Sequence, residues 1–351
     1  MNSFKKLKIR NKDKIIKKHL FKIILGFAIS ILLIYLSIRN VNFKHSFELI
    51  KNANLYWITV SMMFFIFSYF VRTVRWYFLL TPLKKIGVLR SFYFLIFGFF
   101  MNNILPLRLG EFVRAKVAGE KLQISRSSVF ATVVIERLMD VIIFIICFFL
   151  ITIFVEIPQW LKNTFLLCTL IFGFITIFLF FMSKGKDKFL KLISKIKLPK
   201  KILDIVLSLF SKFTTGLSFF NNGKLAFKVF VFSFLVWFVE AFSYMYFFKA
   251  FGVDISIMQS IFVIVVIGVG VIIPTAPGFI GAIEFMGVVA LGVFGIEESV
   301  AFACIASLHF ADMVVLYILG FIGIAKEKLS FSDLFKFATI EENNPEEKNE
   351  K

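Results

Sequence analysis

The sequence predicts an all-α polytopic membrane protein with six full spans and two re-entrant broken-helix hairpins in an inverted repeat, about eight transmembrane segments by hydropathy. Three observations predict this fold class. Hydrophobic residues make up 59% of the 351-residue chain, against roughly 45–50% in soluble domains. Long apolar runs recur along the chain. Two of these runs are interrupted near the middle by proline and glycine.

The charge balance narrows the classes of partner. Lys and Arg number 41 against 22 Asp and Glu, a formal net charge of +19, although only 18% of residues are charged. In so apolar a chain this excess indicates contact with anionic lipid rather than with nucleic acid. The three cysteines, Cys147, Cys168 and Cys304, lie inside apolar runs without paired spacing. We therefore expect no disulfide framework, no metal and no cofactor, and without a Walker motif we expect no direct use of ATP.

The predicted elements begin with a basic cytoplasmic N-terminus, residues 1–20, and a first span at residues 21–38. A spanning helix needs about 20 mostly apolar residues. No small-residue cleavage site follows this run, which predicts a retained helix rather than a signal peptide. The further full spans are predicted at residues 55–71, 129–155, 161–182, 226–248 and 300–324.

Two other apolar segments, residues 91–121 and 257–294, are predicted to be broken helices. The interrupting residues are Asn102, Asn103, Pro106 and Gly110 in the first segment and Pro274, Pro277, Gly278 and Gly281 in the second. Proline removes a backbone donor and disfavours a helical residue before it, so each segment reads as two half-helices around an elbow. The alternative is a set of ordinary spans with proline kinks.

Charge counting predicts how the broken segments sit in the membrane. If residues 91–105 crossed the bilayer, the basic loop at residues 184–201 would face outside, against the positive-inside rule. If each broken segment enters and leaves on one side, that loop and both termini are cytoplasmic, at the cell (plasma) membrane. The two halves, residues 21–155 and 161–325, then have opposite orientation. Such inverted repeats are typical of secondary transporters.

The remaining segments are polar or amphipathic. Residues 183–225 form a basic amphipathic linker between the halves, which can lie on the inner membrane surface. Residues 326–351 are predicted to be a cytoplasmic tail that is disordered at its acidic end. The domain organisation is therefore one transmembrane domain, residues 21–325, between two cytoplasmic ends.

Ionisable residues inside membrane segments are costly and are therefore functional candidates. The first group follows Pro106 and continues on the next predicted span: Arg108, Glu111, Arg114, Glu136, Arg137 and Asp140. Glu136 and Asp140 are one helical turn apart and share a face. Two roles stay open for this group, an ion-pair network that pins the hairpin to the helix and a surface that faces substrate.

The second group surrounds the second elbow and consists of Pro277, Gly278, Gly281, Glu284, Glu240, His309 and Asp312. A helix that begins near Phe279 would point its positive end into the break, where a phosphate can bind. We expect Gly278 and Gly281 to tolerate no bulky side chain there. The alternatives are His309 as a hydrogen-bonded packing residue and Glu240 as the partner of a neighbouring hydroxyl.

Two further arginines, Arg72 and Arg75, come just before Trp76. They follow the predicted second span at its cytoplasmic end. We expect them to anchor the span at the interface beside an aromatic ring.

At these residues the sequence resembles the flippase-like integral membrane family that includes the transmembrane region of lysylphosphatidylglycerol synthase, the multiple peptide resistance factor. The resemblance covers roughly residues 21–325. Its carriers are residues 72–76 (RTVRW), 106–114 (PLRLGEFVR), 125–140 (SRSSVFATVVIERLMD) and 277–284 (PGFIGAIE). The family usually reads Pro-Gly-Gly before the last motif, whereas Phe279 follows Gly278 here. An arginine often found in the family's final span looks replaced around His309.

The resemblance implies movement of a charged phospholipid, such as lysyl-phosphatidylglycerol, between leaflets, and a link to antibiotic resistance. It does not imply synthesis, because a soluble C-terminal domain attaches lysine in the bifunctional relatives and only 27 residues (325–351) follow Ile324 here. The expected partner is a membrane lipid with a charged headgroup. A homo-oligomer and a separate lipid-modifying enzyme remain open as further partners.

Three functions compete. The first is a lipid flippase or transporter, supported by the inverted architecture and the intramembrane charges. The second is a membrane-embedded transferase or accessory factor in lysyl-phosphatidylglycerol or polyprenyl-linked glycan metabolism, against which stands the lack of an Asp-x-Asp motif. The third is a structural or regulatory membrane subunit, in which removal of charge at Glu111, Arg137 and Glu284 would affect assembly only.

Overall fold

The computed structural model describes residues 23–153, 155–195 and 199–329. Every regular element in these ranges is a helix, which confirms the predicted all-α class. The predicted N-terminus at residues 1–20 and the tail from residue 330 onward lie outside the described residues. The first helix is described over Ile23–Ile38. The elements that follow are α2 (Phe43–Lys51), α3 (Leu55–Leu80), α4 (Val88–Ile104), η1 (Pro106–Arg108), α5 (Leu109–Leu122), α6 (Arg126–Ile151), α7 (Gln159–Lys184), α8 (Lys186–Ser194), α9 (Lys200–Gly216), η2 (Ser218–Asn221), α10 (Gly223–Ala250), α11 (Ile257–Gly270), η3 (Pro277–Phe279), α12 (Ala282–Gly292) and α13 (Glu298–Lys326).

Four of these helices, α3, α7, α10 and α13, are long and apolar enough to cross a membrane. The first helix and α2, which meet at a bend of 86°, would together form a fifth candidate span. Helix α6 is as long as α3 but carries Glu136, Arg137 and Asp140, and it is not among the four. The described residues therefore form a multi-pass helical membrane protein with four to five candidate spans. The count of six full spans stays a prediction.

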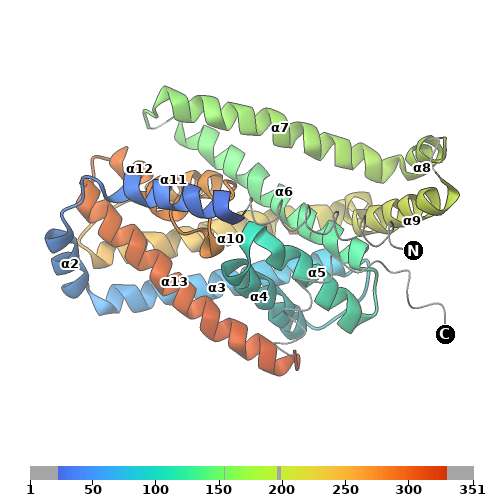
Figure 1. Ribbon diagram of the computed structural model, residues 1–351, viewed down its shortest axis with the longest axis horizontal. Helices are drawn as coiled ribbons and strands as arrows, with labels where there is room; N and C mark the ends of the chain where they lie inside the picture. Colours follow the sequence, from blue (N-terminus) through green and yellow to red (C-terminus); the bar gives the residue numbers. More distant parts are fainter. Residues whose placement is uncertain (1–22, 154, 196–198, 330–351) are drawn as a thin grey trace, which may run out of the picture.

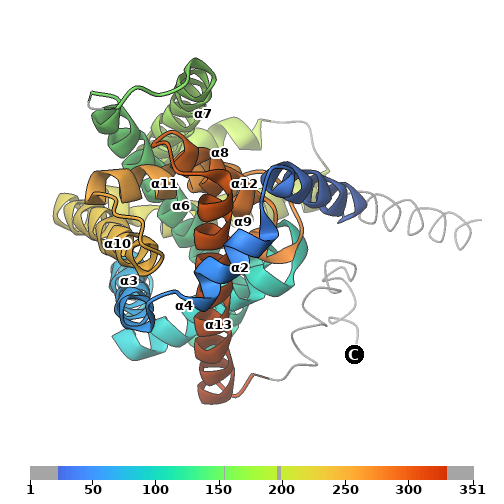
Figure 2. The ribbon, with the colours of Figure 1, turned by 90° about the vertical axis from the view of Figure 1, so that its left-hand side faces the viewer.

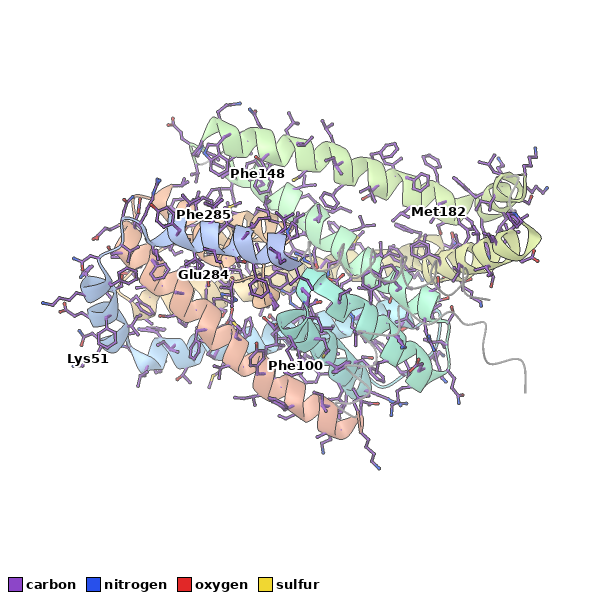
Figure 3. All side chains as sticks on the ribbon, viewed as in Figure 1. Lys51, Phe100, Phe148, Met182, Glu284 and Phe285 are labelled. Carbon is purple, nitrogen blue, oxygen red and sulfur yellow. The ribbon has the colours of Figure 1, made fainter. Side chains whose placement is uncertain are left out.

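The long helices run between two ends of the molecule, the α2 end and the α8 end, named for the helices that lie there (Figure 1). At the α2 end the backbone N–H of Asn54, before α3, donates to the carbonyl of Ala250, the last residue of α10, at 2.9 Å. At the α8 end Lys84, after α3, donates to the carbonyl of Leu122, the last residue of α5, at 2.6 Å. Figure 3 places Lys51 at the α2 end and Met182 near the α8 end.

Each predicted broken segment forms two helices that pack against each other, α4 with α5 and α11 with α12. The α4–α5 hairpin lies in the half of the molecule toward the α8 end, and the α11–α12 hairpin lies toward the α2 end (Figure 1). The turns η1 and η3, at the tips of the two hairpins, contact each other. The prolines therefore act as the sequence predicts, because each tip leaves the helical path at a Pro-containing turn.

The two halves of the chain repeat one pattern of neighbours. Helix α3 packs on α10, α4 packs on α13, and α11 packs on α6. Each helix of the first half has a counterpart in the second: α3 corresponds to α10, α4 to α11, α5 to α12 and α6 to α13. For every pair of these eight helices that are in contact, the pair of their counterparts is in contact too. The tips of the two hairpins, which are far apart in the sequence, therefore meet at one centre.

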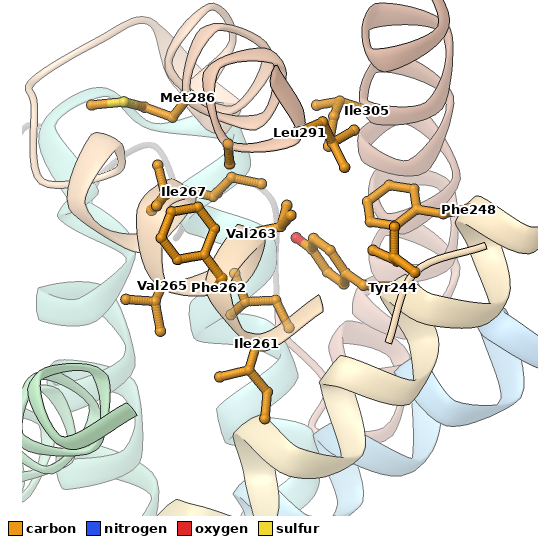
Figure 4. Close-up of a cluster of buried hydrophobic side chains, with 14 of the residues drawn as sticks. Tyr244, Phe248, Ile261, Phe262, Val263, Val265, Ile267, Met286, Leu291 and Ile305 are labelled. Atoms are coloured by element: carbon orange, nitrogen blue, oxygen red, sulfur yellow. The ribbon is translucent and has the colours of Figure 1, made fainter. Parts of the chain in front are cut away.

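Apolar side chains pack together on both sides of this centre. One cluster is formed by α10, α11, α12 and α13, with Tyr244, Phe248, Phe262, Ile267, Met286, Leu291 and Ile305 among its members (Figure 4). A second cluster surrounds α3, α4 and α6 and includes the fully buried Trp76, Phe94 and Phe97. The end view places α7 at the periphery of the bundle, on a different side from the first helix (Figure 2). Most side chains of α7 are not buried, as expected for a helix that faces lipid.

Candidate functional site

A cavity of about 350 Å³ lies at the centre, where both hairpin tips meet the long helices. It receives residues from α3, α4, η1, α5, α6, α10, η3 and α13, and apolar residues of α6, α7 and α11 extend its wall. Of the residues that the sequence singled out, the cavity is lined by Arg108, Glu111, Arg137, Asp140, Glu240, His309 and Asp312. Arg114, Glu136, Pro277, Gly278, Gly281 and Glu284 are not part of its lining.

The carboxylates of α6 are held by arginines from two other helices. Arg114 of α5 donates to Glu136 at 3.2 Å, and Arg75 of α3 donates to Asp140 at 2.5 Å. The side chains of Glu136 and Arg75 are fully buried. Arg114 links α5 to α6, and Arg75 links α3 to α6, so these buried ion pairs fasten the α4–α5 hairpin to α6 and α6 to α3.

Arg137 connects this buried network to the cavity. Its guanidinium bridges Glu111 of α5 at 2.7 Å and Asp140 at 3.1 Å, and its side chain stays 26% exposed. The ring of Phe99 lies 5.2 Å from the same guanidinium. Within this group Arg114 and Glu136 belong to the buried network alone, whereas Glu111, Arg137 and Asp140 also line the cavity.

The expectation that Arg72 and Arg75 are interfacial anchors is wrong. Both side chains are buried, Arg75 completely. Arg72 forms an ion pair with Glu240 of α10, and its guanidinium lies 4.3 Å from the ring of Trp237. Ser68 also donates to Glu240 at 3.2 Å, which is the hydroxyl partner expected for that residue. The cause of the error is the predicted end of the second span at residue 71, because α3 continues to Leu80.

The two hairpin tips are joined by Arg108 of η1 and Phe279 of η3. Arg108 donates to the carbonyl of Val271 at 2.6 Å, and its guanidinium lies 5.3 Å from the ring of Phe279. Both residues have a left-handed backbone, with φ of 56° and 60°. This conformation is unusual for side chains with a Cβ, and such strain is retained where the surroundings determine it.

The second elbow differs from the expectation in one respect that matters for ligand binding. Helix α12 begins at Ala282, three residues after Phe279, and its N-cap is Gly281. Glu284 accepts a hydrogen bond from the backbone N–H of Gly281 at 2.6 Å, and its other oxygen lies 2.6 Å from Nδ1 of His309. The carboxylate of Glu284 thus caps the start of its own helix, where we had expected a phosphate. His309 is hydrogen-bonded to Glu284 and also lines the cavity.

The glycines of this elbow have conformations and neighbours that explain why they are glycines. Gly278 has φ of 72° and Gly281 has φ of 91°, which L side chains rarely adopt. A Cβ on Gly281 would lie 2.7 Å from the backbone oxygen of Ser30 in the first helix. Ser30 also accepts from the N–H of Ala276 and donates to the carbonyl of Ile280, both at 2.8 Å. Packing of the first helix, in addition to backbone freedom, restricts Gly281.

Several lining residues were not among the site candidates from the sequence: Tyr69, Arg72, Asn102, Asn103, Trp237 and Tyr244. The two asparagines were noted as interruptions only, although Asn102 is buried with an unpartnered side-chain oxygen. Extending the second span through the apolar residues after Trp76 would have placed Arg72 inside the membrane. Among the described residues no group of three or more His, Cys, Asp or Glu is arranged to hold a metal ion.

These features define a class of protein, a helical multi-pass membrane protein with a charged cavity between two broken helices. The chain belongs to the family described as the lysylphosphatidylglycerol synthase TM region, whose model matches residues 23–320. This confirms the family resemblance of the motifs.

The curated relatives are archaeal membrane proteins. A UPF0104 membrane protein of Methanocaldococcus jannaschii is 27% identical over 207 residues, 58% of this chain and 84% of that protein. A UPF0104 membrane protein of Methanothermobacter thermautotrophicus is 26% identical over 267 residues, 70% of this chain and 77% of that protein. A second protein of Methanocaldococcus jannaschii with the same description is 24% identical over 324 residues, 88% of this chain and 93% of its own length. No solved structure matches the chain.

Proposed function

We propose that the protein is a lipid translocase that moves a phospholipid with a charged headgroup between the two leaflets. The observation that carries the proposal is the central cavity, which combines buried charged groups with an apolar wall. An amphipathic lipid needs both kinds of surface at once. Charged residues are costly inside a membrane and are typical of substrate pathways there.

Arg108 is the residue best suited to a lipid phosphate. Its guanidinium lines the cavity and is bonded to a backbone carbonyl, and no carboxylate among the described residues forms an ion pair with it. A guanidinium without a carboxylate partner can bind a phosphate by donating two parallel N–H hydrogen bonds to it. Glu111 and Asp140, which pair with Arg137, line the same cavity, and a headgroup amine can approach them there.

The membrane arrangement belongs to the same proposal. We take α6 and the first helix as full spans beside α3, α7, α10 and α13, and both hairpins as re-entrant. The hairpins then enter from opposite leaflets, and the α8 end, with its basic linker, faces the cytoplasm of a cell whose plasma membrane holds the protein. The repeated neighbour pattern of the two halves supports this inverted arrangement, in which tips of broken helices meet at midplane.

Lysyl-phosphatidylglycerol is the first lipid to test, because the family is described by the membrane region of its synthase. The purified protein would be reconstituted into vesicles containing this lipid, and fluorescamine, which does not cross the bilayer, would report the amines in the outer leaflet over time. We expect the wild-type protein to expose lipid that stays hidden in protein-free vesicles. Arg108→Gln should slow exposure, whereas Arg126→Gln, in an exposed pair with Glu120, should not.

The proposal fails if wild-type vesicles expose no more amine than protein-free vesicles, with lysyl-phosphatidylglycerol and with phosphatidylethanolamine alike. It also fails if Arg108→Gln and Arg126→Gln expose lipid at equal rates. Size-exclusion profiles of each variant before reconstitution would separate a transport defect from misfolding.

A further inference from the structure

Asp312 of α13 stands apart from the other carboxylates of the cavity. Glu111 is paired with Arg137, Asp140 with Arg75, and Glu240 with Arg72. Asp312 also lines the cavity, but its Oδ1 is buried without a hydrogen-bond partner. No residue of the described ranges forms an ion pair with it.

The groups around Asp312 supply too little positive charge. Helix α13 packs against α2, α3, α4, α10 and α12. The titratable groups of these helices that interact with Asp312 are Tyr69 from α3 and Glu240 and Tyr244 from α10. Arg72 from α3 is paired with Glu240, and Glu284 from α12 is engaged with His309 of α13. Helix α4 contributes Asn102 and Asn103 to the cavity, and no residue of α2 lines it.

Arg72 of α3 lines the cavity beside Glu240. Its guanidinium is already occupied by Glu240 and by the face of the Trp237 ring. Glu240 acts on Asp312 by repulsion between like charges. An ionised carboxylate without a partner is costly in such surroundings. Asp312 therefore has to hold a proton or pair with a cation.

We propose that Asp312 is a proton-carrying carboxyl group that exchanges its proton for the cationic amine of a lipid headgroup. The proposal rests on the proposed translocase function. In the empty cavity the Asp312 carboxyl holds a proton and is neutral. When the headgroup amine enters, the O–H bond breaks, the proton leaves to water in the cavity, and the carboxylate pairs with the ammonium. When the lipid leaves, the carboxylate takes up a proton again, so lipid and proton move in opposite directions.

The proton site itself can be tested without any lipid substrate. Infrared spectra of the full chain in nanodiscs would be compared between wild type and Asp312→Asn for the carbonyl band of a protonated carboxyl group. We expect Asp312→Asn to lose a band that Glu298→Gln keeps, because Glu298 is an exposed carboxylate in the first turn of the same helix. An unchanged spectrum in Asp312→Asn would overturn the proposal.

Glu240→Gln gives a second reading that does not depend on the fold of the Asp312 variant. Removal of that carboxylate ends its repulsion on Asp312 and leaves Arg72, in the same cavity, without its ion-pair partner. We expect the carbonyl band to disappear in Glu240→Gln as well, because the loss of a like charge and the gain of an unpaired cation both favour the ionised carboxylate. Persistence of the band in this variant would contradict the part that we give to Glu240 in keeping Asp312 protonated.

Coupling to the lipid would be tested by adding lysyl-phosphatidylglycerol to weakly buffered protein with a pH-sensitive dye. Wild type should release protons on binding, and Asp312→Asn should release none. Exposure of lipid in vesicles by Asp312→Asn should no longer respond to a pH gradient. If wild type exposes lipid without proton release, the inference is wrong and the translocase stands. If the Asp312 band is present but no lipid binds, the translocase is wrong and the proton site stands.

Discussion

At the level of single residues, buried arginines neutralise the carboxylates of α6. Arg114 lies over the ring of Trp76 at 4.7 Å and pairs with Glu136, and both side chains are almost completely buried. A buried pair of this kind contributes little net stability compared with apolar residues, but loss of one partner is costly because the other charge is left uncompensated. This asymmetry is directly measurable.

Glu136→Gln should destabilise the protein by about 3–5 kcal/mol, because Arg114 then lacks its carboxylate. Unfolding in detergent micelles, followed by heat or denaturant, would measure the loss. The matched control is Glu120→Gln, whose pair with Arg126 is exposed and should contribute less than about 1 kcal/mol. Adding Arg114→Met to Glu136→Gln should recover part of the stability. A Glu136→Gln protein as stable as wild type would show that the buried Arg114 charge does not need this carboxylate.

Phe279 provides a test of backbone strain at the second elbow. Its φ of 60° should make Phe279→Gly more stable than Phe279→Ala, because a left-handed conformation costs a residue with a Cβ about 1–2 kcal/mol. Both variants lose the ring that contacts Arg108, so the comparison isolates the backbone. Phe285, inside α12, is the control, where glycine should be less stable than alanine by about 1 kcal/mol. The same order of stability at both positions would contradict the strained elbow.

At the scale of elements, the hairpins explain how polar backbone can lie within a membrane protein. The tips η1 and η3 contact each other and α4, and Ser30 of the first helix forms hydrogen bonds to the backbone on both sides of η3, so this non-helical backbone is surrounded by protein. Irregular backbone at membrane depth is tolerated only in such surroundings. Each hairpin starts and ends at one end of the molecule, as the proposed re-entrant arrangement requires.

Single cysteines at the two ends of one hairpin should therefore be labelled from the same side of the membrane. Lys85→Cys precedes α4 and Gln123→Cys follows α5, and both positions are exposed. Asp254→Cys and Glu297→Cys flank the α11–α12 hairpin and should share the opposite side. An impermeant maleimide applied to a chain without its native cysteines would report this. Labelling of Lys85→Cys and Gln123→Cys from different sides would mean that the segment crosses the membrane.

At the scale of the whole molecule, charge is unevenly distributed between the two ends. The α8 end carries the basic linker, in which Lys184, Lys186, Lys188, Lys191 and Lys195 follow within twelve residues (184–195). Cytoplasmic loops carry an excess of Lys and Arg in membrane proteins. The basic end is therefore the one we assign to the cytoplasm.

In intact cells an impermeant thiol reagent should label Lys51→Cys, at the α2 end, and leave Lys188→Cys, on α8, unlabelled. Both side chains are exposed, so a difference reports sidedness rather than burial. After lysis both should react, which controls for reactivity. Labelling of Lys188→Cys from outside intact cells would reverse the orientation and with it the direction in which each hairpin enters.

The sequence by itself determined the class of the protein, the family, and the places where two helices break. Those features depend on local composition, since apolar runs, prolines and glycines act on the segment that contains them. The tertiary structure decided which charges meet. Arg72 pairs with Glu240, 168 positions away, and Glu284 caps its own helix instead of facing a ligand. Such pairings follow from how distant helices pack. Asp312 was a candidate in the sequence, but only the packing of the described helices shows that its Oδ1 is buried without a partner among them.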